Sequence, residues 1–183
     1  MATTTAVRLG TLTAMSPFRP DLVDCWMFRV PMSARHVPHI EVLLLRRSTG
    51  RILPGLWQCV SGSLEPGERI AVGALRELHE ETGFTAGDIL AFYDLDLVNQ
   101  FHEPTVDGVM TAAVFAVRLR DDSEPHLSTE HDGARWLPVD EAFEEVIWPG
   151  YRTAIARIRD DLADEERAAW FELTLEGDRR PPA

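Results

Sequence analysis

Three glutamates stand at a spacing that brings their carboxylates together: Glu77, Glu80 and Glu81. Side chains three and four residues apart project from one side of a helix, so a helix here would gather all three acids on one face. Like charges at this spacing destabilise an isolated helix by about 0.2–0.5 kcal/mol per pair, which favours a compensating cation. Hard divalent cations such as Mg²⁺ bind oxygen clusters and share their remaining sites with phosphates. The spacing therefore predicts metal-assisted phosphoryl chemistry, against the simpler reading of a solvated acidic helix face.

The segment that carries these acids has the pattern of an amphipathic helix. A Pro-Gly pair at 66–67 marks its start, and Gly83 marks its end, because glycine commonly terminates helices. Apolar residues recur at three- and four-residue spacing on the face opposite the acids, at Ile70, Ala71, Ala74, Leu75 and Leu78. Arg76 can bind a carboxylate through two hydrogen bonds, and we expect it to pair with Glu68 or Glu80 and hold the acids in place.

The other apolar runs predict strands on both sides of this helix. They are rich in β-branched and aromatic residues and lie between turn-forming residues, at Val23–Val30, Ile40–Leu45, Leu56–Val60, Ile89–Val98, Val109–Leu119 and Ala134–Leu137. Two helical pieces follow Pro138, one of them over Tyr151–Leu162. The segment Asn99–Gly108 is interpreted as a loop that could cover a site. This order indicates an α/β or α+β domain in which a mixed β-sheet is sandwiched between α-helices.

The totals fit one globular domain with ragged ends. The chain has 183 residues, of which 45% are hydrophobic and 26% charged. We expect an N-terminal arm at 1–20, the globular domain at 21–165 and a fraying C-terminal tail at 166–183. The net charge of −12 argues against binding to a nucleic acid polymer, which needs a basic face. No apolar run is long enough for a signal peptide or a membrane span, so a soluble, cytoplasmic protein is expected.

Cys25 and Cys59 lie in apolar, strand-like surroundings, without a Cys-x-x-Cys spacing or a nearby cluster of histidines and cysteines. Neither a disulfide framework nor a zinc site is indicated by this placement. We interpret both residues as reduced core thiols. A catalytic cysteine would need surroundings that lower the thiol pKa, and none are evident.

The acidic helix and the loop before it together resemble the Nudix box. That signature has a Gly, five residues, a Glu, seven residues, Arg-Glu, an aliphatic, any residue, Glu-Glu, any residue, a Gly and an apolar residue. The chain fills it without a gap, with Gly62, Glu68, Arg76, Glu77, Leu78, Glu80, Glu81, Gly83 and Phe84. The last of these is aromatic where an aliphatic is usual. The resemblance covers residues 62–84 and implies the Nudix fold, whose mixed sheet between helices fits the order of elements above.

The resemblance also implies roles for the box residues. Glu77, Glu80 and Glu81 would bind Mg²⁺, with Mn²⁺ as an alternative, and the Ser61 carbonyl could add a ligand. Gly62 would permit a close approach. In the family, either one box glutamate or a glutamate from a later loop activates the attacking water, and both alternatives stay open here. The bound metal would lower the pKa of water and neutralise the diphosphate oxygens. A homodimer would be in keeping with the same resemblance.

Segments outside the box narrow the resemblance. The run at 56–68, Leu-Trp-Gln-Cys-Val-Ser-Gly-Ser and onward, is similar to dihydroneopterin triphosphate pyrophosphatases and related dATP pyrophosphohydrolases. The Ser-Thr-Glu-His segment at 128–131, followed by a Trp-Leu pair, adds to this similarity and implies that Glu130 is a further metal ligand. That subgroup has a Trp-Ser-Asn-Arg-like segment where this chain has Trp-Pro-Gly-Tyr-Arg at 148–152. The implied reaction converts a nucleoside or pterin triphosphate to its monophosphate and pyrophosphate.

The candidates for binding such a substrate are Arg46, Arg47, Trp57, Gly62, Ser63, His102 and His131. The tryptophan could stack on a base or pterin, or it could be an aromatic residue of the core or sheet edge. The two arginines, at a strand end, could bind phosphate or could be solvated charges. The histidines could transfer a proton or bind phosphate, although a loop histidine is more often a surface residue.

Other functions stay open beside this one. ADP-ribose hydrolases often have a proline, and dinucleoside polyphosphate hydrolases a tyrosine, a short distance beyond the box, where this chain has Gln100, Phe101 and His102. The absence of both markers counts against these two substrate classes, which are kept as alternatives to the triphosphate. An isopentenyl diphosphate isomerase would carry a cysteine-containing motif that is not evident. A non-catalytic Nudix module that binds a nucleotide and regulates a partner would be expected to have degraded box acids.

Overall fold

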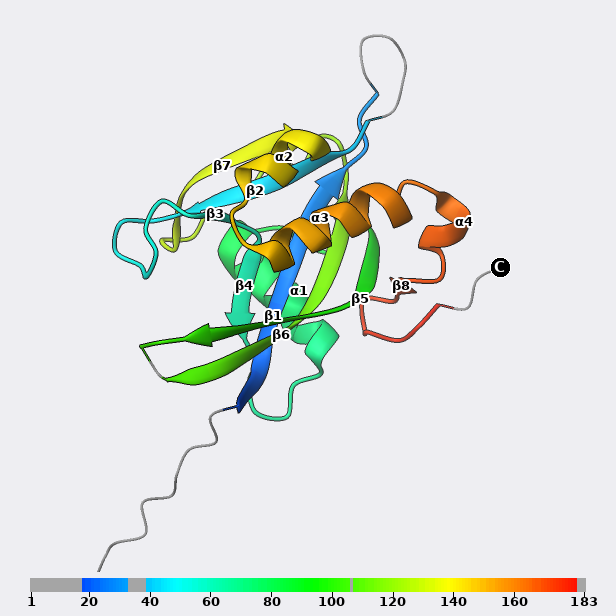
Figure 1. Cartoon of the computed structure of the whole chain (residues 1–183). Coiled ribbons are helices and arrows are strands. Elements are labelled where there is room, and N and C mark those ends of the chain that lie inside the picture. The colour runs from blue at the N-terminus through cyan, green and yellow to red at the C-terminus, as the bar shows by residue number, and fades with distance from the viewer. Residues whose placement is uncertain (1–17, 33–38, 106, 181–183) are drawn as a thin grey trace, which may run out of the picture.

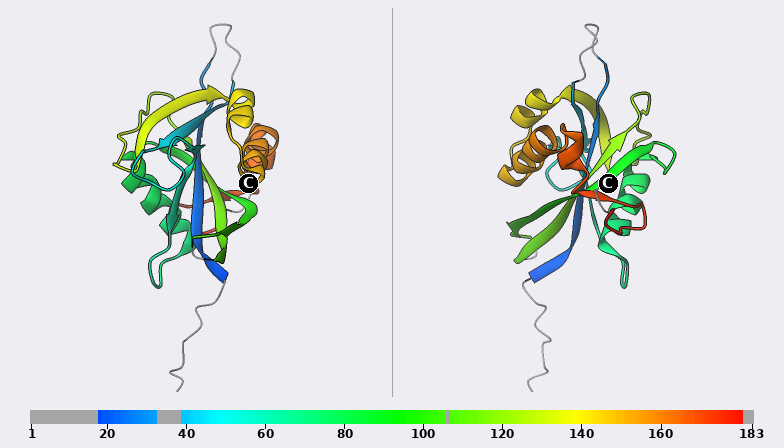
Figure 2. Two further views of the ribbon diagram at one scale, coloured as in Figure 1. Left: turned by 60° about the vertical axis from the view of Figure 1, so that its left-hand side comes forward. Right: turned by 90° about the vertical axis from the view of Figure 1, so that its right-hand side faces the viewer.

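A mixed sheet lies between two helical layers in the computed structural model, which describes residues 18–32, 39–105 and 107–180. Helix α1 (Ile70–Thr82) covers one face of the sheet, and α2 (Val139–Glu145) with α3 (Pro149–Asp161) covers the other (Figures 1 and 2). A short α4 (Glu165–Ala168) follows. This is the mixed α+β architecture that the order of elements predicts. Within the described ranges, no helix is both long and apolar enough to cross a bilayer.

Eight strands of the described chain form the sheet, in the order β3-β2-β1-β6-β5-β8, with β4 paired to β1 and β7 paired to β2. The central strands β1 and β6 run parallel, and the other pairs run antiparallel. The strands are β1 (Phe18–Arg29), β2 (Glu41–Arg47), β3 (Trp57–Gln58), β4 (Val60–Ser63), β5 (Ile89–Glu103), β6 (Gly108–Leu119), β7 (His131–Pro138) and β8 (Glu172–Leu173).

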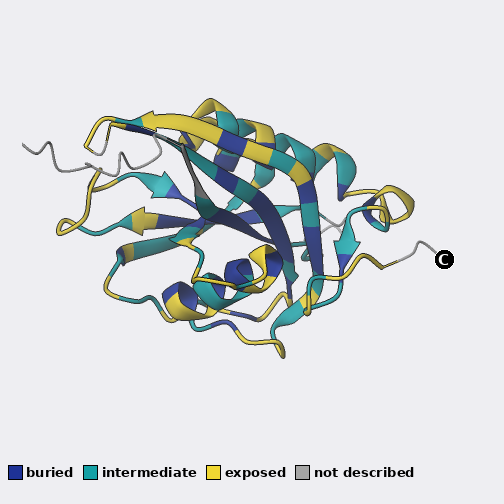
Figure 3. Ribbon diagram, turned by 90° about the horizontal axis from the view of Figure 1, so that it is seen from below, coloured by how far each residue is buried: buried dark blue, intermediate teal, exposed yellow. Residues whose placement is uncertain are grey.

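The central strand β1 shows why both faces of the sheet are covered. Trp26 and Phe28 pack into the cluster under α2 and α3, whereas Cys25 and Met27 pack into the cluster under α1. Successive side chains of a strand point to opposite faces, and all four of these are fully buried. Figure 3 shows the same pattern as dark, buried strands between the helices. A strand covered on both faces has a continuous apolar sequence, as this one has.

Both cysteines belong to this core. Cys25 and Cys59 are free and buried. Burial raises the pKa of each thiol above its ordinary range, so neither is poised to form a thiolate at neutral pH. The structure therefore agrees with the interpretation of two reduced core thiols.

Helix α1 ends as its sequence predicts. Gly83 has a left-handed φ of 72°, which glycine adopts without strain. The loop after β6 then crosses this end of the helix. The His126 and Ser128 N–H groups donate to the carbonyls of Thr82 and Glu81 at 2.7 and 3.0 Å. These two bonds fix the loop that precedes β7 against the helix that carries the acids.

The segment Asn99–Gly108, predicted to be a loop, is mostly a hairpin. Strand β5 continues to Glu103 and pairs with β6, from Asn99 opposite Ala112 to Glu103 opposite Gly108. Ladder hydrogen bonds with the neighbouring strand outweigh the polar composition that suggested a loop. The prediction of a loop is wrong, and Asn99, at the start of this segment, lies against Gly150 at the start of α3.

The two ends of the chain also differ from the predictions. Strand β1 begins at Phe18, before the predicted start at Val23, and the rest of the arm at 1–20 lies outside the described residues. In the predicted tail, β8 pairs with β5, and Leu173 is buried against the cluster under α1. Fraying of the tail is therefore wrong for residues up to 180, because an apolar side chain anchors it to the sheet edge.

Candidate active site

The box loop and the acidic helix meet at Gly62. This residue lies on β4 opposite Val23 of the central strand, and the Glu77 carboxylate lies directly over it. A Cβ at position 62 would collide with that carboxylate. The close approach expected of this glycine is therefore present, and it places Glu77 against the edge of the sheet.

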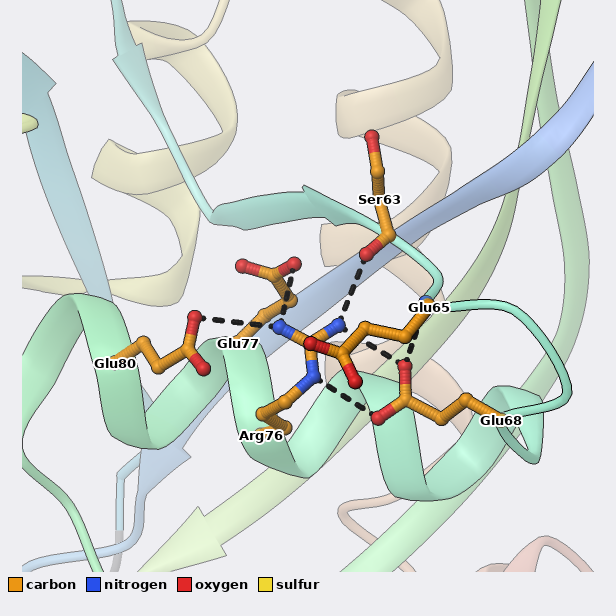
Figure 4. Close-up of polar contacts among 6 residues, drawn as sticks. All are labelled: Ser63, Glu65, Glu68, Arg76, Glu77 and Glu80. Carbon is orange, nitrogen blue, oxygen red and sulfur yellow. Dashed lines mark hydrogen bonds and ion pairs between the residues drawn. The ribbon is translucent and has the colours of Figure 1, made fainter.

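Arg76 holds the loop and the helix together (Figure 4). Its Nε and Nη2 donate to the two oxygens of Glu68 at 2.9 and 3.0 Å, and Nη2 also donates to the Ser63 carbonyl at 2.9 Å. Its Nη1 donates to Glu77 at 3.0 Å and to Glu80 at 3.2 Å. Pairing was expected with Glu68 or with Glu80, and both pairs occur. Ser63 thus takes part in the site through its carbonyl, which accepts a hydrogen bond from Arg76. We call the Arg76 guanidinium with its hydrogen bonds the clamp.

Glu81 is the most buried of the box acids. Only 4% of the residue is exposed, and its Oε2 has no hydrogen-bond partner among the described residues. Burial raises the pKa of Glu81 to about 8, and the negative charges of Glu130 and Glu77 act in the same direction, while a backbone hydrogen bond with Ser61 opposes them. Burial also raises the pKa of Glu77, with Arg76 opposing it. Glu77 and Glu81 stand one turn apart on α1, and the Ser128 N–H bond to the Glu81 carbonyl brings the segment that carries Glu130 to the same end of the helix.

We call Glu77, Glu81 and Glu130 the acid cluster. The last of these comes from the segment before β7 and pairs with Arg51, whose Nη2 lies 2.8 Å from its Oε1. Glu80 is more exposed, with 55% of its side chain accessible, and contributes through the clamp of Arg76. The structure thus brings the later glutamate suggested by the Ser-Thr-Glu-His segment close to the box acids.

His131 lies beneath this cluster rather than on the surface. The residue is 5% exposed, its Nδ1 is 3.4 Å from Glu81 Oε2, and its Nε2 is 3.5 Å from Gln58 Nε2. Burial lowers the pKa of His131 to about 4, helped by the positive charges of Arg47 and Arg51. A substrate-binding histidine or a surface one was expected here; the ring instead is buried, is neutral at pH 7 and faces a carboxylate.

The donor set of the acid cluster fits a hard divalent cation. The negative charge of Glu130 raises the pKa of Glu77 and of Glu81, and a buried carboxylate oxygen without a hydrogen-bond partner is costly unless a cation completes its coordination. As they stand, no three His, Cys, Asp or Glu side chains of the described ranges are already arranged around one metal position. Arg51 holds the Glu130 carboxylate, which a metal ion would need, so metal binding would require Glu130 to change partner. Arg76 binds one oxygen of Glu77 and positions this acid.

Trp57 and Arg46 lie side by side on the face of the sheet that α2 and α3 cover. The Arg46 guanidinium is 5.8 Å from the Trp57 ring centroid and pairs with Asp132 at 2.6 Å. Arg135, which the sequence did not single out, is closer to the ring, at 3.9 Å, and pairs with Glu145 at 2.7 Å. The Arg135 guanidinium thus stacks on the Trp57 indole in the free protein. The side chains of Arg46 and Arg135 are both partly exposed.

Two polar side chains that the sequence analysis missed are buried on the same face. Asn99 Nδ2 donates to Asp24 Oδ2 at 2.7 Å, and burial raises the pKa of Asp24. An acid in the middle of the apolar β1 segment was the available signal. His102, at the far end of β5, instead pairs with Asp107 at 3.3 Å and is 60% exposed, away from these buried groups.

A known family matches most of the chain. The family model described as NUDIX domain matches residues 30–158. The pig (Sus scrofa) asymmetrical bis(5'-nucleosyl)-tetraphosphatase is 35% identical over 104 residues, covering 56% of this chain and 67% of the relative. A Myxococcus xanthus protein named octanoyltransferase is 36% identical over 122 residues, covering 66% of this chain but 32% of the relative. The chain thus spans about a third of that second relative.

Solved structures show the same fold. An Ap4A hydrolase from C. elegans matches with a TM-score of 0.64 and 20% identity, covering 78% of this chain and 96% of that one. The dihydroneopterin triphosphate pyrophosphohydrolase of E. coli matches with a TM-score of 0.59 and 21% identity, covering 81% and 97%. The chain belongs to the Nudix family, as the box at 62–84 predicts.

Proposed function

We propose that this chain hydrolyses a nucleoside or pterin triphosphate to the monophosphate and pyrophosphate, with Mg²⁺ bound by the acid cluster. The observation that carries the proposal is the buried Glu81 Oε2, which belongs to the acid cluster, lies 3.4 Å from His131 Nδ1 and has no hydrogen-bond partner among the described residues. Glu80 and the Ser61 carbonyl, next to the cluster, complete the proposed ligand set. Mn²⁺, with the same preference for oxygen ligands, would be an alternative metal.

The chain's own residues supply positioning for this reaction. When bound, the metal would lower the pKa of water and neutralise diphosphate oxygens. Arg76 fixes Glu77 relative to the box loop, and Gly62 leaves room for that carboxylate against β4. His131 faces Glu81 from beneath and limits how its carboxylate can turn. We assign Arg46 to phosphate binding and Trp57 to stacking on the base or pterin, because both reach a partly exposed surface.

A second substrate class has support of its own. The pig relative is named for cleaving bis(5'-nucleosyl) tetraphosphates, and this chain covers 67% of it at 35% identity. The E. coli protein named for dihydroneopterin triphosphate shares the fold at 21% identity. A dinucleoside polyphosphate is therefore the alternative substrate. A cytoplasmic location is kept as part of the same proposal. A homodimer belongs to it through the family resemblance, and light scattering after size-exclusion chromatography tests the dimer.

The test is a substrate panel with purified protein and Mg²⁺. It contains nucleoside triphosphates, dihydroneopterin triphosphate, ADP-ribose, Ap4A and isopentenyl diphosphate, with phosphate, pyrophosphate, nucleotide and isomer products measured separately. Glu81→Gln removes the charge of the most buried ligand, and Glu144→Gln, an exposed acid of α2, is the matched control.

Pyrophosphate release from a triphosphate, lost in Glu81→Gln and kept in Glu144→Gln, is the expected result. Preferential cleavage of Ap4A under the same conditions would replace the triphosphate with the second substrate class. Binding of nucleotides without turnover of any compound would contradict the hydrolase and favour a non-catalytic Nudix module.

A further inference from the structure

Glu130 has a positively charged partner at the edge of the acid cluster. Its carboxylate is 2.8 Å from Arg51, and the two side chains are 36% and 41% exposed. The Ser128 N–H, two residues before Glu130, donates to the Glu81 carbonyl at 3.0 Å, so the segment that carries Glu130 lies against the end of α1 that carries Glu81. Arg51 therefore neutralises one member of the cluster while the other two stay largely protected from solvent.

The loop 48–56 that carries Arg51 is fixed at its base. The Ser48 N–H donates to the Glu130 carbonyl at 2.9 Å, and its hydroxyl donates to the Thr129 carbonyl at 3.0 Å. Beyond this base, the tip of the loop is exposed to solvent: Leu53 is 50% exposed and has a left-handed φ of 56°. The base thus holds Arg51 beside the cluster, while its side chain lies in solvent-accessible space.

Arg51 and Arg76 differ in how firmly they hold their acids. Arg76 is 22% exposed and donates to three carboxylates and a carbonyl. Among the described residues, the guanidinium of Arg51 pairs with Glu130 alone. An exposed ion pair of this kind contributes little to stability, so it can be exchanged at low cost. A clamp of several bonds cannot be exchanged in the same way.

We propose that Arg51 exchanges partners during binding: it is the counterion of Glu130 in the free protein and binds a substrate phosphate once a metal ion takes up Glu130. The inference rests on the proposed function and adds a phosphate-binding residue to it. A carboxylate cannot give the same oxygen fully to a guanidinium and to a divalent cation. The guanidinium released beside the cluster matches the shape and charge of a phosphate group.

The exchange predicts two affinity changes of opposite sign for Arg51→Ala. Mn²⁺ binding without nucleotide, measured by electron paramagnetic resonance, should tighten by about two- to fivefold, since a competing cation is gone. Binding of α,β-methylene-dATP, measured by calorimetry with Mg²⁺, should weaken by about tenfold, since a charged hydrogen bond to phosphate is lost. Arg51→Lys keeps the charge and should show a smaller change in both. Arg120→Ala removes another exposed arginine from an ion pair, with Asp122, and is the matched control.

The outcomes separate this inference from the proposed function. If Arg51 served folding alone, Arg51→Ala would bind both Mn²⁺ and the nucleotide more weakly, and that result overturns the exchange. An unchanged affinity for either ligand overturns it too. Wild-type protein that binds no Mn²⁺ and cleaves no triphosphate contradicts the proposed function and the exchange with it. Wild-type protein that does both, with Arg51→Ala affinities like those of Arg120→Ala, overturns the exchange alone.

Discussion

His131 Nδ1 lies 3.4 Å from Glu81 Oε2, and the two side chains are 0% and 5% exposed. The distance is that of an ion pair, yet neither atom has a hydrogen-bond partner among the described residues. Burial lowers the pKa of His131 to about 4 and raises that of Glu81 to about 8, so both are mainly neutral at pH 7 in the metal-free protein. The contact is therefore one between two neutral groups, and a bound cation would favour the ionised form of Glu81 as its ligand.

The stability of the metal-free protein should fall as pH rises from about 6.5 to about 8, whereas between about pH 4 and 6.5 the lowered pKa of His131 acts in the opposite direction and offsets the effect of Glu81. The pKa of Glu81 is raised from its ordinary 4.5 to about 8 in the folded state, so the folded protein binds this proton more tightly than the unfolded chain does. Its contribution is complete below the lower value and is lost as pH passes the higher one, by on the order of a few kcal/mol. Urea unfolding in the presence of a chelator measures this slope.

Glu81→Gln isolates the contribution of this carboxylate. Glutamine cannot ionise, so the variant should lack that part of the slope and be more stable than wild type at pH 8 without metal. Added Mg²⁺ should stabilise wild type at pH 8 and leave the variant nearly unchanged. Equal pH slopes for both proteins would contradict the raised pKa of Glu81.

Gly62→Ala should disturb the site more than the fold. A Cβ there would collide with the Glu77 carboxylate and push it off β4. We expect turnover to fall at least about tenfold, because small displacements of positioned groups are costly for catalysis. Gly87→Ala is the control, since the nearest atom to a Cβ at that position is Thr85 Oγ1 at 3.6 Å, an ordinary contact. Equal turnover of the two variants would show that the approach of Glu77 to β4 is not needed.

Arg76→Ala should weaken metal binding, in contrast to the effect predicted for Arg51→Ala. Its guanidinium joins Glu68 and the Ser63 carbonyl of the box loop to Glu77 of the helix. Without the clamp, the loop and the acids lose their relative position, and we expect about tenfold weaker Mn²⁺ binding. Arg76→Lys keeps the charge but not the two-bond geometry, and it should recover only part of the affinity. Unchanged Mn²⁺ affinity in Arg76→Ala would count against the clamp.

The local parts of the site were predictable from sequence, because helical periodicity depends only on neighbours along the chain. Glu77, Glu80 and Glu81 fall on one face of α1 wherever the helix packs. Arg76 reaches Glu68 through the short turn that joins loop and helix. The end of the helix at the glycine follows from backbone conformation alone.

The distant pairs were not predictable in this way. Asn99 and Asp24 are 75 residues apart in sequence, and their contact depends on the register of β5 and β1 with β6 between them. Arg51 meets Glu130 because two separate loops are joined by backbone hydrogen bonds. Pairing register is set by the whole sheet, so local patterns reveal the types of these residues but not their partners.

Trp57 allows a direct choice between substrate stacking and a purely structural role. Trp57→Ala should raise KM about tenfold with kcat nearly unchanged if a base or pterin stacks there, because stacking contributes to binding in ground and transition states alike. Trp57→Phe keeps an aromatic face and should recover most of the affinity. Arg135 lies over the ring at 3.9 Å, so loss of the indole also frees this arginine. A lower unfolding midpoint without a change in KM would assign Trp57 to the core.

Gly150→Ala should destabilise the fold through a single contact. A Cβ there would collide with the Asn99 carboxamide, whose Nδ2 donates to the buried Asp24 carboxylate. Moving that amide leaves a buried acceptor without its donor, at a cost of about 1–3 kcal/mol in the free energy of unfolding. Gly50→Ala, with nothing within 4 Å of the new Cβ, should be nearly neutral. In an Asn99→Ala background the collision is gone, so Gly150→Ala should then cost little, and additive losses in the double variant would contradict the contact.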